Sequence, residues 1–163
     1  MARNAVMPVN FENARIIFKN FEGRESRYNR SGDRNFSVVI DDPAEGHYLA
    51  DLGWNVRIRE PREEGEKPMM SIQVAVSFRS FPNIPPAEIY VYTRKSRRKL
   101  TEETVQELDY MEIRNVDLTI RPRFWTDDNG ETHIKAYLKE MHVTMEESAW
   151  EEKYAAYEYP EEG

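Results

Sequence analysis

Apolar and polar residues alternate with a period of two along much of this chain, which is the pattern of half-buried β-strands. Clear runs cover residues 54–59, 72–79, 116–121 and 134–145, a shorter run covers 36–40, and a less regular one covers 14–21. The sequence Asp127-Asp128-Asn129-Gly130 separates two of these runs and predicts a tight hairpin turn. Antiparallel strands with short connections are therefore expected to dominate the fold.

Two short helices interrupt the strands. One is expected over residues 43–52, because Asp42 is a favourable N-cap, a proline follows it, and Gly53 is a favourable C-cap. A second is expected over residues 101–108, where two early glutamates suit the helix dipole. This order of elements predicts a mainly β Greek-key barrel or sandwich with helical insertions.

The net charge of −7 is concentrated at the C-terminal end of the 163 residues. Residues 143–163 contain seven acidic and one basic side chain, so residues 1–142 carry a net charge of only −1. The chain is therefore expected to divide into a folded domain over 1–145 and an acidic, flexible tail over 146–163. A nearly neutral domain can still gather its basic residues on one face, so the overall charge does not exclude an anionic ligand.

The composition argues against several classes of function. The chain has no cysteine, which excludes disulfides, cysteine zinc sites and thiol nucleophiles. The three histidines lack metal-ligand spacing, and no phosphate-binding glycine loop or nucleophile elbow is found. No apolar run approaches the roughly 20 residues of a membrane span. We therefore expect a cytoplasmic protein without enzyme activity, cofactor, metal or membrane contact. A metal-dependent nuclease using Asp41-Asp42 or Asp127-Asp128 is the enzyme alternative, although these pairs are interpreted as a helix cap and a turn.

Basic and aromatic residues recur on the polar sides of the predicted strands. They are Arg57, Arg59, Tyr90, Tyr92, Arg94, Arg121, Arg123, Trp125, Lys135, Tyr137 and Lys139. Aromatic rings can stack bases while basic side chains follow phosphates, so the pattern favours a surface for single-stranded nucleic acid. From these residues alone, an ordinary solvated sheet face explains the pattern equally well.

Two basic segments lie outside these runs. Residues 23–34 contain four arginines, one tyrosine and two glycines, and they indicate a mobile basic loop, which can close over a nucleic acid. The alternative is a hairpin loop whose arginines pair with Glu25 and Asp33. Residues 94–99 place five positive charges in six positions, which is typical of a nucleic-acid patch. The alternative there is a solvated linker before the second helix.

Three segments resemble a known family. They are NFENARIIFKNFEG (residues 10–23), YNRSGDRNF (28–36) and LGWNVR (52–57). Together they are similar to the single-stranded-DNA-binding proteins of tailed bacteriophages, most closely over residues 10–59. The resemblance implies an OB-fold barrel, sequence-tolerant binding of single-stranded DNA, and an acidic tail that contacts replication or recombination proteins in the cytoplasm of the host cell.

The chain departs from the family pattern in two ways. It ends in Tyr159-Pro160-Glu161-Glu162-Gly163, whereas bacterial members of the wider class end in an acidic run closed by an aromatic residue. Internal tyrosines of the tail are the alternative anchors. The predicted strands also exceed the five of a minimal OB barrel, so extra strands are expected.

The combined hypothesis is an OB-fold-like Greek-key barrel with extra strands that binds single-stranded DNA largely without sequence specificity and protects it during phage replication or recombination. Bases are expected to stack on Tyr90, Tyr92, Trp125 and Tyr137. The loop is expected to contribute Arg27, Tyr28 and Arg30, and the remaining basic residues, with Arg97 and Arg98, are expected to meet phosphates. The expected partner contacts of the tail are Glu151, Glu152, Tyr157, Tyr159, Glu161 and Glu162. A structural or protein-interaction β-sandwich, such as a virion component, is the alternative, and homo-oligomer formation stays open.

Overall fold

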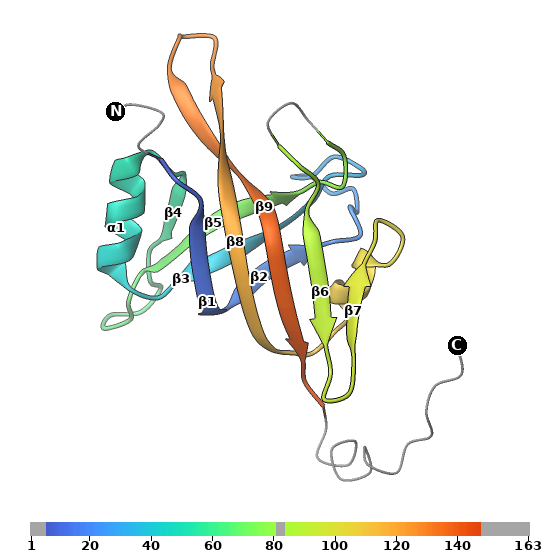
Figure 1. The fold of residues 1–163 in the computed structure, drawn as a ribbon. Helices are drawn as coiled ribbons and strands as arrows, with labels where there is room; N and C mark the ends of the chain where they lie inside the picture. Colours follow the sequence, from blue (N-terminus) through green and yellow to red (C-terminus); the bar gives the residue numbers. More distant parts are fainter. Residues whose placement is uncertain (1–5, 81–83, 148–163) are drawn as a thin grey trace.

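The computed structural model describes residues 6–80 and 84–147, which form nine β-strands, one α-helix and one 3₁₀-helix (Figure 1). In chain order these are β1 (Val9–Ala14), β2 (Ile16–Asn20), β3 (Arg34–Ile40), α1 (Pro43–Leu52), β4 (Val56–Arg59), β5 (Met69–Val76), β6 (Glu88–Tyr92), β7 (Arg97–Leu100), η2 (Val105–Asp109), β8 (Ile113–Thr126) and β9 (Thr132–Met145). No helix in these two ranges has both the length and the apolar character needed to cross a membrane.

The strands follow the path β1-β8-β9-β5-β3-β2, and neighbours along it are antiparallel except for the parallel pair β5–β9. Only Arg15 separates β1 from β2, so the two ends of the path are halves of one bent strand. The sheet therefore curls back on itself. Counted with β1–β2 as a single strand, this is the order of the five-stranded Greek-key barrel of the OB fold, which confirms the predicted fold class.

Five further elements extend the barrel. Helix α1 and strand β4 connect β3 to β5, and β4 pairs with the first half of β5. The hairpin β6–β7 and the helix η2 connect β5 to β8, and β6 pairs in parallel with the second half of β9. Figure 1 shows the β6–β7 hairpin beside the lower half of β9 and α1 on the opposite side of the barrel. These elements account for the strands beyond five.

The barrel is filled by the inward side chains of its strands. Phe36 of β3 is fully buried and stacks on Phe21, with ring centroids 5.3 Å apart. Val105 and Leu108 of η2 are also fully buried, so this helix adds its apolar side to the same core. Alternation with period two in the strands and the apolar side of η2 together build one continuous core.

The first predicted helix is confirmed, with the predicted caps. The Asp42 side chain accepts a hydrogen bond from the backbone N–H of Ala44 at 3.0 Å, and Gly53 has a φ of 107° that other residues rarely adopt.

The second predicted helix is shorter than expected. Only Val105–Asp109 is helical, and it is a 3₁₀-helix. The hydroxyl groups of Thr101 and Thr104 accept hydrogen bonds from the backbone N–H groups of Glu103 and Thr101, which holds the preceding residues in a turn.

Two expectations for the strands need correction. The basic segment 94–99 is neither a linker nor a loop throughout, because it closes the β6–β7 hairpin and its last residues belong to β7. The predicted apolar side of strand 54–59 is buried at Trp54 but not at Ile58, which is 47% exposed. Strand β4 pairs only with β5 and lies at an edge, so one apolar position of the alternation remains in solvent.

Candidate nucleic-acid interface

A groove with a volume of about 770 Å³ lies on the outer face of the barrel. Its floor is formed by β3, β5 and β9, whose paired residues Asn35, Ala75 and Tyr137 form one row across the sheet. The loop between β2 and β3 contributes one border and the β8–β9 hairpin contributes another. Small and amide side chains on the floor leave space above the sheet for an extended ligand.

Aromatic side chains border this groove and form part of its floor. Tyr28 of the β2–β3 loop is 89% exposed, and Trp125 of β8 is 49% exposed. Tyr137 lies on the floor with only 6% of its surface exposed. The two exposed rings at the borders can stack bases of a single strand, whereas the predicted stacking ring of Tyr137 is buried between them and offers no free face in this conformation.

Cationic side chains surround the ring of Tyr137. The ammonium group of Lys135 lies 5.3 Å from the ring centroid, and the guanidinium group of Arg123 lies 5.9 Å from it and donates a hydrogen bond to the hydroxyl group at 3.4 Å. Arg121 pairs with Tyr137 in the β8–β9 ladder and therefore lies on the same face. Lys135 and Arg123 thus meet at the ring of Tyr137, and Arg121 is their neighbour in the sheet.

Two carboxylates also border the groove, and each has an arginine partner. Asp33 lies 3.7 Å from Arg30, and Glu102 lies 3.6 Å from Arg34. The first pair is the one that the alternative interpretation of the loop expects. These pairs reduce the negative potential at the groove, so the carboxylates oppose an anionic ligand less than their number suggests.

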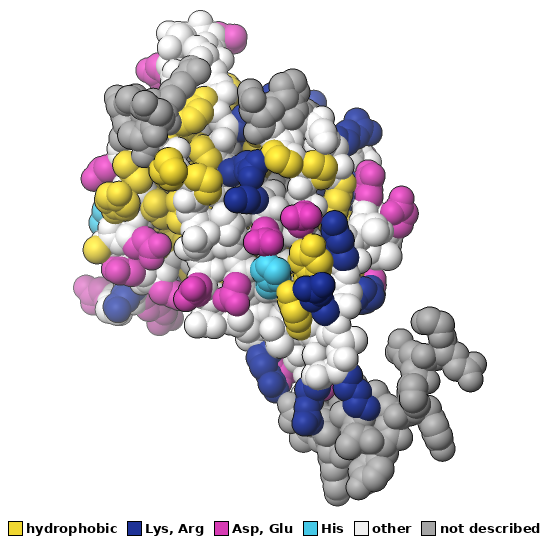
Figure 2. All heavy atoms as spheres, viewed as in Figure 1, with side chains coloured by type: hydrophobic (Ala, Val, Ile, Leu, Met, Phe, Trp, Pro, Cys, Tyr) yellow, Lys and Arg dark blue, Asp and Glu magenta, His cyan; other side chains and the backbone are white. Residues whose placement is uncertain are grey.

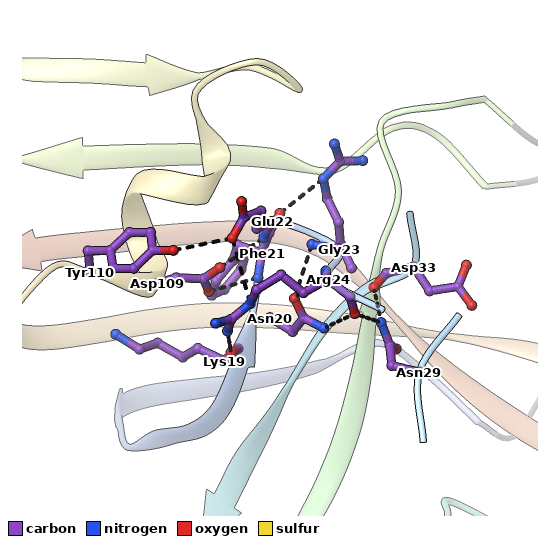
Figure 3. A network of polar contacts seen from close by, with 11 residues as sticks. Lys19, Asn20, Phe21, Glu22, Gly23, Arg24, Asn29, Asp33, Asp109 and Tyr110 are labelled. Atoms are coloured by element: carbon purple, nitrogen blue, oxygen red, sulfur yellow. Dashed lines mark hydrogen bonds and ion pairs between the residues drawn. The ribbon is translucent and has the colours of Figure 1, made fainter. Parts of the chain in front are cut away.

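The β2–β3 loop is held at its base by side chains of β2 and η2 (Figure 3). The side-chain oxygen of Asn20 accepts hydrogen bonds from the backbone N–H groups of Gly23 and Arg24, at 3.1 and 2.8 Å. The carboxylate of Asp109 accepts from Phe21 and Glu22, at 2.8 and 2.9 Å. Both contacts join the loop to the body of the barrel.

Asn29 holds the outer part of the same loop. Its amide nitrogen lies 2.8 to 3.0 Å from the backbone carbonyl oxygens of Arg24, Arg30 and Asp33, so its two N–H groups are shared among three acceptors, and its oxygen accepts from the amide of Asn35 at 2.8 Å. Figure 3 shows Asn29 pointing toward Arg24 from the returning side of the loop. The segment predicted as a mobile loop is therefore held by several hydrogen bonds that share Asn29, and they oppose its rearrangement.

A close approach of two glycines completes the loop. The N–H of Gly32 donates to the carbonyl oxygen of Gly23 at 2.8 Å. Gly23 has a φ of 78°, and a Cβ atom there would lie 3.0 Å from the backbone of Gly32. A side chain at Gly23 would therefore separate the two arms of the loop.

The β8–β9 hairpin that carries Trp125 is also held in place. Asp127 accepts hydrogen bonds from the N–H groups of Asn129 and Glu131, both at 2.9 Å, and its other oxygen lies 2.7 Å from Nε2 of His133. The hydrogen bond from His133, helped by those from the backbone, holds the pKa of the Asp127 carboxyl below its usual range. The predicted turn is confirmed, and both of its arms are tied to Asp127.

The side chains of Asp127, Glu131 and His133 are the one group among the described residues that is arranged so that it could hold a metal ion. Their ligand atoms lie within 4.8 Å of one another. Both oxygens of Asp127 already take part in hydrogen bonds of the turn, so the arrangement is explained without a cation and we assign no metal to it.

Other predicted residues lie outside the groove, on the β6–β7 hairpin. Tyr90 stacks on His142 of β9, with ring centroids 5.4 Å apart and an angle of 8°, and Arg97 lies 5.3 Å from the Tyr90 ring. The hydroxyl group of Tyr92 lies 2.7 Å from Nδ1 of His142. In Figure 2, acidic, basic and hydrophobic side chains are interspersed on the side where β6, β7, β8 and β9 lie in front. The aromatic and basic residues thus form two clusters, not one continuous surface.

The residues of the basic segment 94–99 contact different neighbours. Arg98 makes a bidentate pair with Glu107, at 2.7 and 3.1 Å, and this contact raises the pKa of its guanidinium group. Lys99 lies 3.5 Å from Glu88. The backbone N–H of Arg94 donates to Glu147 at 2.9 Å. The charges of the segment are therefore partly balanced by neighbouring carboxylates.

The remaining predicted basic residues take separate places. Arg27 lies 5.8 Å from the ring of Tyr28, and Arg57 of β4 donates to the groove residue Gln73 at 3.0 Å. Arg59 ends β4, and Lys139 is the extra residue where β9 shifts register against β8. Both of these side chains are exposed.

Sequence reasoning missed the uncharged part of the groove. Asn35, Asn55, Gln73 and Phe78 line it, and none of them belongs to the predicted set. The outward positions of β3 and β5 were recognisable from the alternation, but amide side chains there carry no signal that separates a binding floor from an ordinary surface.

The residues that directly follow the predicted domain boundary at residue 145 contact the barrel. Glu146 makes a bidentate contact with Arg114, at 3.0 and 3.1 Å, which lowers the pKa of its carboxyl. The two first acidic residues of the predicted tail, Glu146 and Glu147, thus contact the barrel. Residues 148–163, with all six predicted partner contacts, lie outside the described residues.

Comparisons with known proteins bear on this site. No protein with a curated description matches the sequence. Among solved structures, the chain is similar to the single-stranded DNA-binding protein from bacteriophage Enc34 in complex with ssDNA, with a TM-score of 0.54 at 12% identity, covering 86% of this chain and 88% of that one. The same phage protein without the complex gives a TM-score of 0.52, with 82% of it covered, and its C-terminal truncation gives 0.51, with 87% covered, both at 12% identity and 86% of this chain.

These structural similarities support the OB-type barrel, and the family assignment comes from the sequence. The family model described as "Putative phage ssDNA-binding domain" matches residues 1–162, which is almost the whole chain. The chain belongs to this family of phage single-stranded-DNA-binding proteins.

Proposed function

We propose that the groove between the β2–β3 loop and the β8–β9 hairpin holds single-stranded DNA, largely without sequence specificity. The observation that carries this proposal is the cluster of Tyr28, Trp125 and Tyr137 with Lys135 in one groove on the outer face of the barrel. Family membership supports the choice of ligand. The groove also lies between the two loops that OB folds use for oligonucleotides.

In this proposal aromatic rings and cations have separate tasks. Bases stack on the exposed rings of Tyr28 and Trp125, and each true stacking contact contributes about 1–3 kcal/mol. Lys135, Arg121 and Arg123 meet phosphates, which makes binding sequence-tolerant because every nucleotide carries the same phosphate. The hydrogen bonds of the β2–β3 loop reduce the conformational freedom that Tyr28 loses on binding.

The biological role follows from the same binding. A protein that covers single-stranded DNA protects it during phage replication or recombination in the host cytoplasm, and it needs neither a cofactor nor a catalytic step. The acidic tail would contact replication or recombination proteins. Tyr90, Tyr92, Arg94, Arg97 and Arg98 would touch DNA only where a longer strand leaves the groove.

Titration of a fluorescent oligo-dT tests the proposal. Trp125→Ala is expected to weaken binding by about 5- to 150-fold if the indole stacks on a base. Tyr48→Ala is the matched control, because Tyr48 is 62% exposed on α1 and lies outside the groove. Equal affinity of the two variants, or wild-type binding to duplex as tight as to single strands, would contradict the groove proposal and favour the protein-interaction alternative.

A further inference from the structure

Phe18 places a large apolar ring in solvent in the middle of a barrel strand. It belongs to β2 and is 65% exposed, whereas Ile16, two residues earlier, packs against the core. In a regular strand residues two apart point to the same face, so Phe18 would be expected to point inward with Ile16. Its exposure requires a local change of the backbone.

A β-bulge makes that change. Ile17 pairs with Ser37 and Asn20 pairs with Asn35, so the step from one pair to the next takes three residues on β2 and two on β3. Phe18 within this step has a φ of 54°. The extra residue breaks the alternation, and Phe18 is turned away from the core.

The bulge strains the backbone at Phe18, and burial of the ring does not offset this strain. Positive φ is unfavourable for any residue with a bulky side chain, and it is an outlier for phenylalanine. The ring also gains little burial in exchange. Strained backbone and bulges that re-aim a side chain are concentrated at binding sites, so the combination points from the observed strain to a function.

The register of the sheet puts Phe18 beside the proposed DNA site. Ser37, the partner of Ile17, pairs with the groove residue Gln73, and Asn35, the partner of Asn20, pairs with Ala75 and through it with Tyr137. Strand β2 is thus one strand beyond the groove floor. With about 4.8 Å between neighbouring strands, β2 lies about 14 Å from β9 and about 19 Å from β8 along the curved sheet.

We propose that Phe18 is a further base-stacking residue, at the end of a DNA path that crosses the strands from Trp125 over Tyr137 to β2. This inference rests on the proposed function of the groove and adds one base-stacking side chain to it. Arg15, three residues before Phe18, is exposed, and its guanidinium group lies 3.9 Å from the sulfur of Met69 at the start of β5. The strained bulge keeps the ring available to a base.

The first test is binding of a 20-nucleotide oligo-dT to Phe18 variants. Phe18→Ala is expected to weaken binding by roughly 5- to 150-fold, the range for loss of one stacked base. Phe18→Trp is expected to keep the wild-type affinity, and Phe18→Leu, which stays apolar without an aromatic face, is expected to behave like Phe18→Ala.

A second test separates binding from stability. Phe18→Gly removes the ring and relieves the positive φ, so it is expected to raise the melting temperature while it weakens binding. Asn13 of β1 is the matched control, because it also has a positive φ, of 51°. Asn13→Gly is expected to raise the melting temperature and leave the oligo-dT affinity unchanged.

The outcomes are distinct. Wild-type protein that does not bind oligo-dT would remove the proposed function itself. Tight wild-type binding that Phe18→Ala and Phe18→Gly do not weaken would overturn only the role of Phe18. Wild-type affinity in Phe18→Leu would show that the contact is apolar without stacking, and this result would also overturn the stacking role of Phe18. A change in molecular mass by sedimentation in Phe18→Ala, with unchanged DNA affinity, would assign the ring to contact with a second copy of the chain instead.

Discussion

The indole of Trp125 lies against the imidazole of His133, with ring centroids 4.6 Å apart, and His133 in turn contacts Asp127. Trp125 and His133 are opposite each other in the β8–β9 ladder, so the ring at the border of the groove rests on a side chain that the turn holds. The position of Trp125 therefore depends on the hydrogen bonds of Asp127.

This dependence predicts an acid-sensitive hairpin. A carboxyl whose pKa is lowered by folding stabilises the fold above its ordinary pKa, about 3.9 for aspartate, and loses that contribution as the pH falls through the lower folded value. Asp127→Asn is expected to lower the melting temperature at pH 5 and to converge with wild type toward pH 2, as followed by circular dichroism. Asp128→Asn in the same turn is the control. A constant difference between Asp127→Asn and wild type over this range would contradict the prediction.

Asn29 is expected to act on DNA through the position of Tyr28. Asn29→Ala removes hydrogen bonds to four residues of the loop and its base, so a loss of about 1–3 kcal/mol in the free energy of unfolding is expected. It is also expected to weaken oligo-dT binding. In a double-mutant cycle with Tyr28→Ala, the binding effect of Asn29→Ala should largely disappear. Fully additive effects would show that Asn29 acts on the groove by another route.

The salt dependence of binding is expected to distinguish two basic residues. If Lys135 meets a phosphate, Lys135→Ala should reduce the slope of log K against log salt by about 0.7. Arg98→Ala should leave this slope unchanged, because the guanidinium group is committed to Glu107. Binding measured between about 50 and 200 mM salt tests both variants. A smaller slope for Arg98→Ala would place the β6–β7 hairpin in the DNA path.

Trp54 contains a buried N–H group without a hydrogen-bond partner among the described residues. Trp54→Phe removes this unsatisfied donor and keeps an aromatic ring in the core, so it is expected to cost less stability than Trp54→Ala. Trp54→Ala should instead cost about 3–5 kcal/mol, because it leaves a cavity. Chemical denaturation measures both. Equal losses in the two variants would mean that the N–H group has a partner.

Removal of residues 148–163 is expected to tighten DNA binding at low salt. These residues contain five acidic side chains and one basic side chain, and a tethered anionic segment competes with DNA at a high effective concentration. The deletion keeps Glu146 and Glu147, which contact the barrel. Comparison of oligo-dT affinity at two salt concentrations tests this, and an unchanged affinity at low salt would show that the tail does not compete.

Much of the fold was predictable because its signals are local. The helix over residues 43–52 begins and ends at its capping residues, and four consecutive residues, 127–130, specify the hairpin turn. The β6–β7 hairpin was not predictable from residues 94–99, because five charges in six positions obscure the alternation of a strand. The second helix was predicted to begin too early, since the hydroxyl groups of Thr101 and Thr104 favour a turn before it.

The sequence by itself determined the strand alternation, the helix caps, the concentration of acidic residues at the C-terminal end and the resemblance to phage DNA-binding proteins, because each resides in neighbouring residues or in composition. Only the tertiary structure decided which basic and aromatic residues share a groove. Tyr28, Trp125 and Tyr137 meet because strands distant in sequence pair across the barrel, while Tyr90 and Tyr92 lie apart beside His142. Phe18 turned outward for the same reason, since the register between β2 and β3 places a bulge there and the alternation of the sequence does not show it.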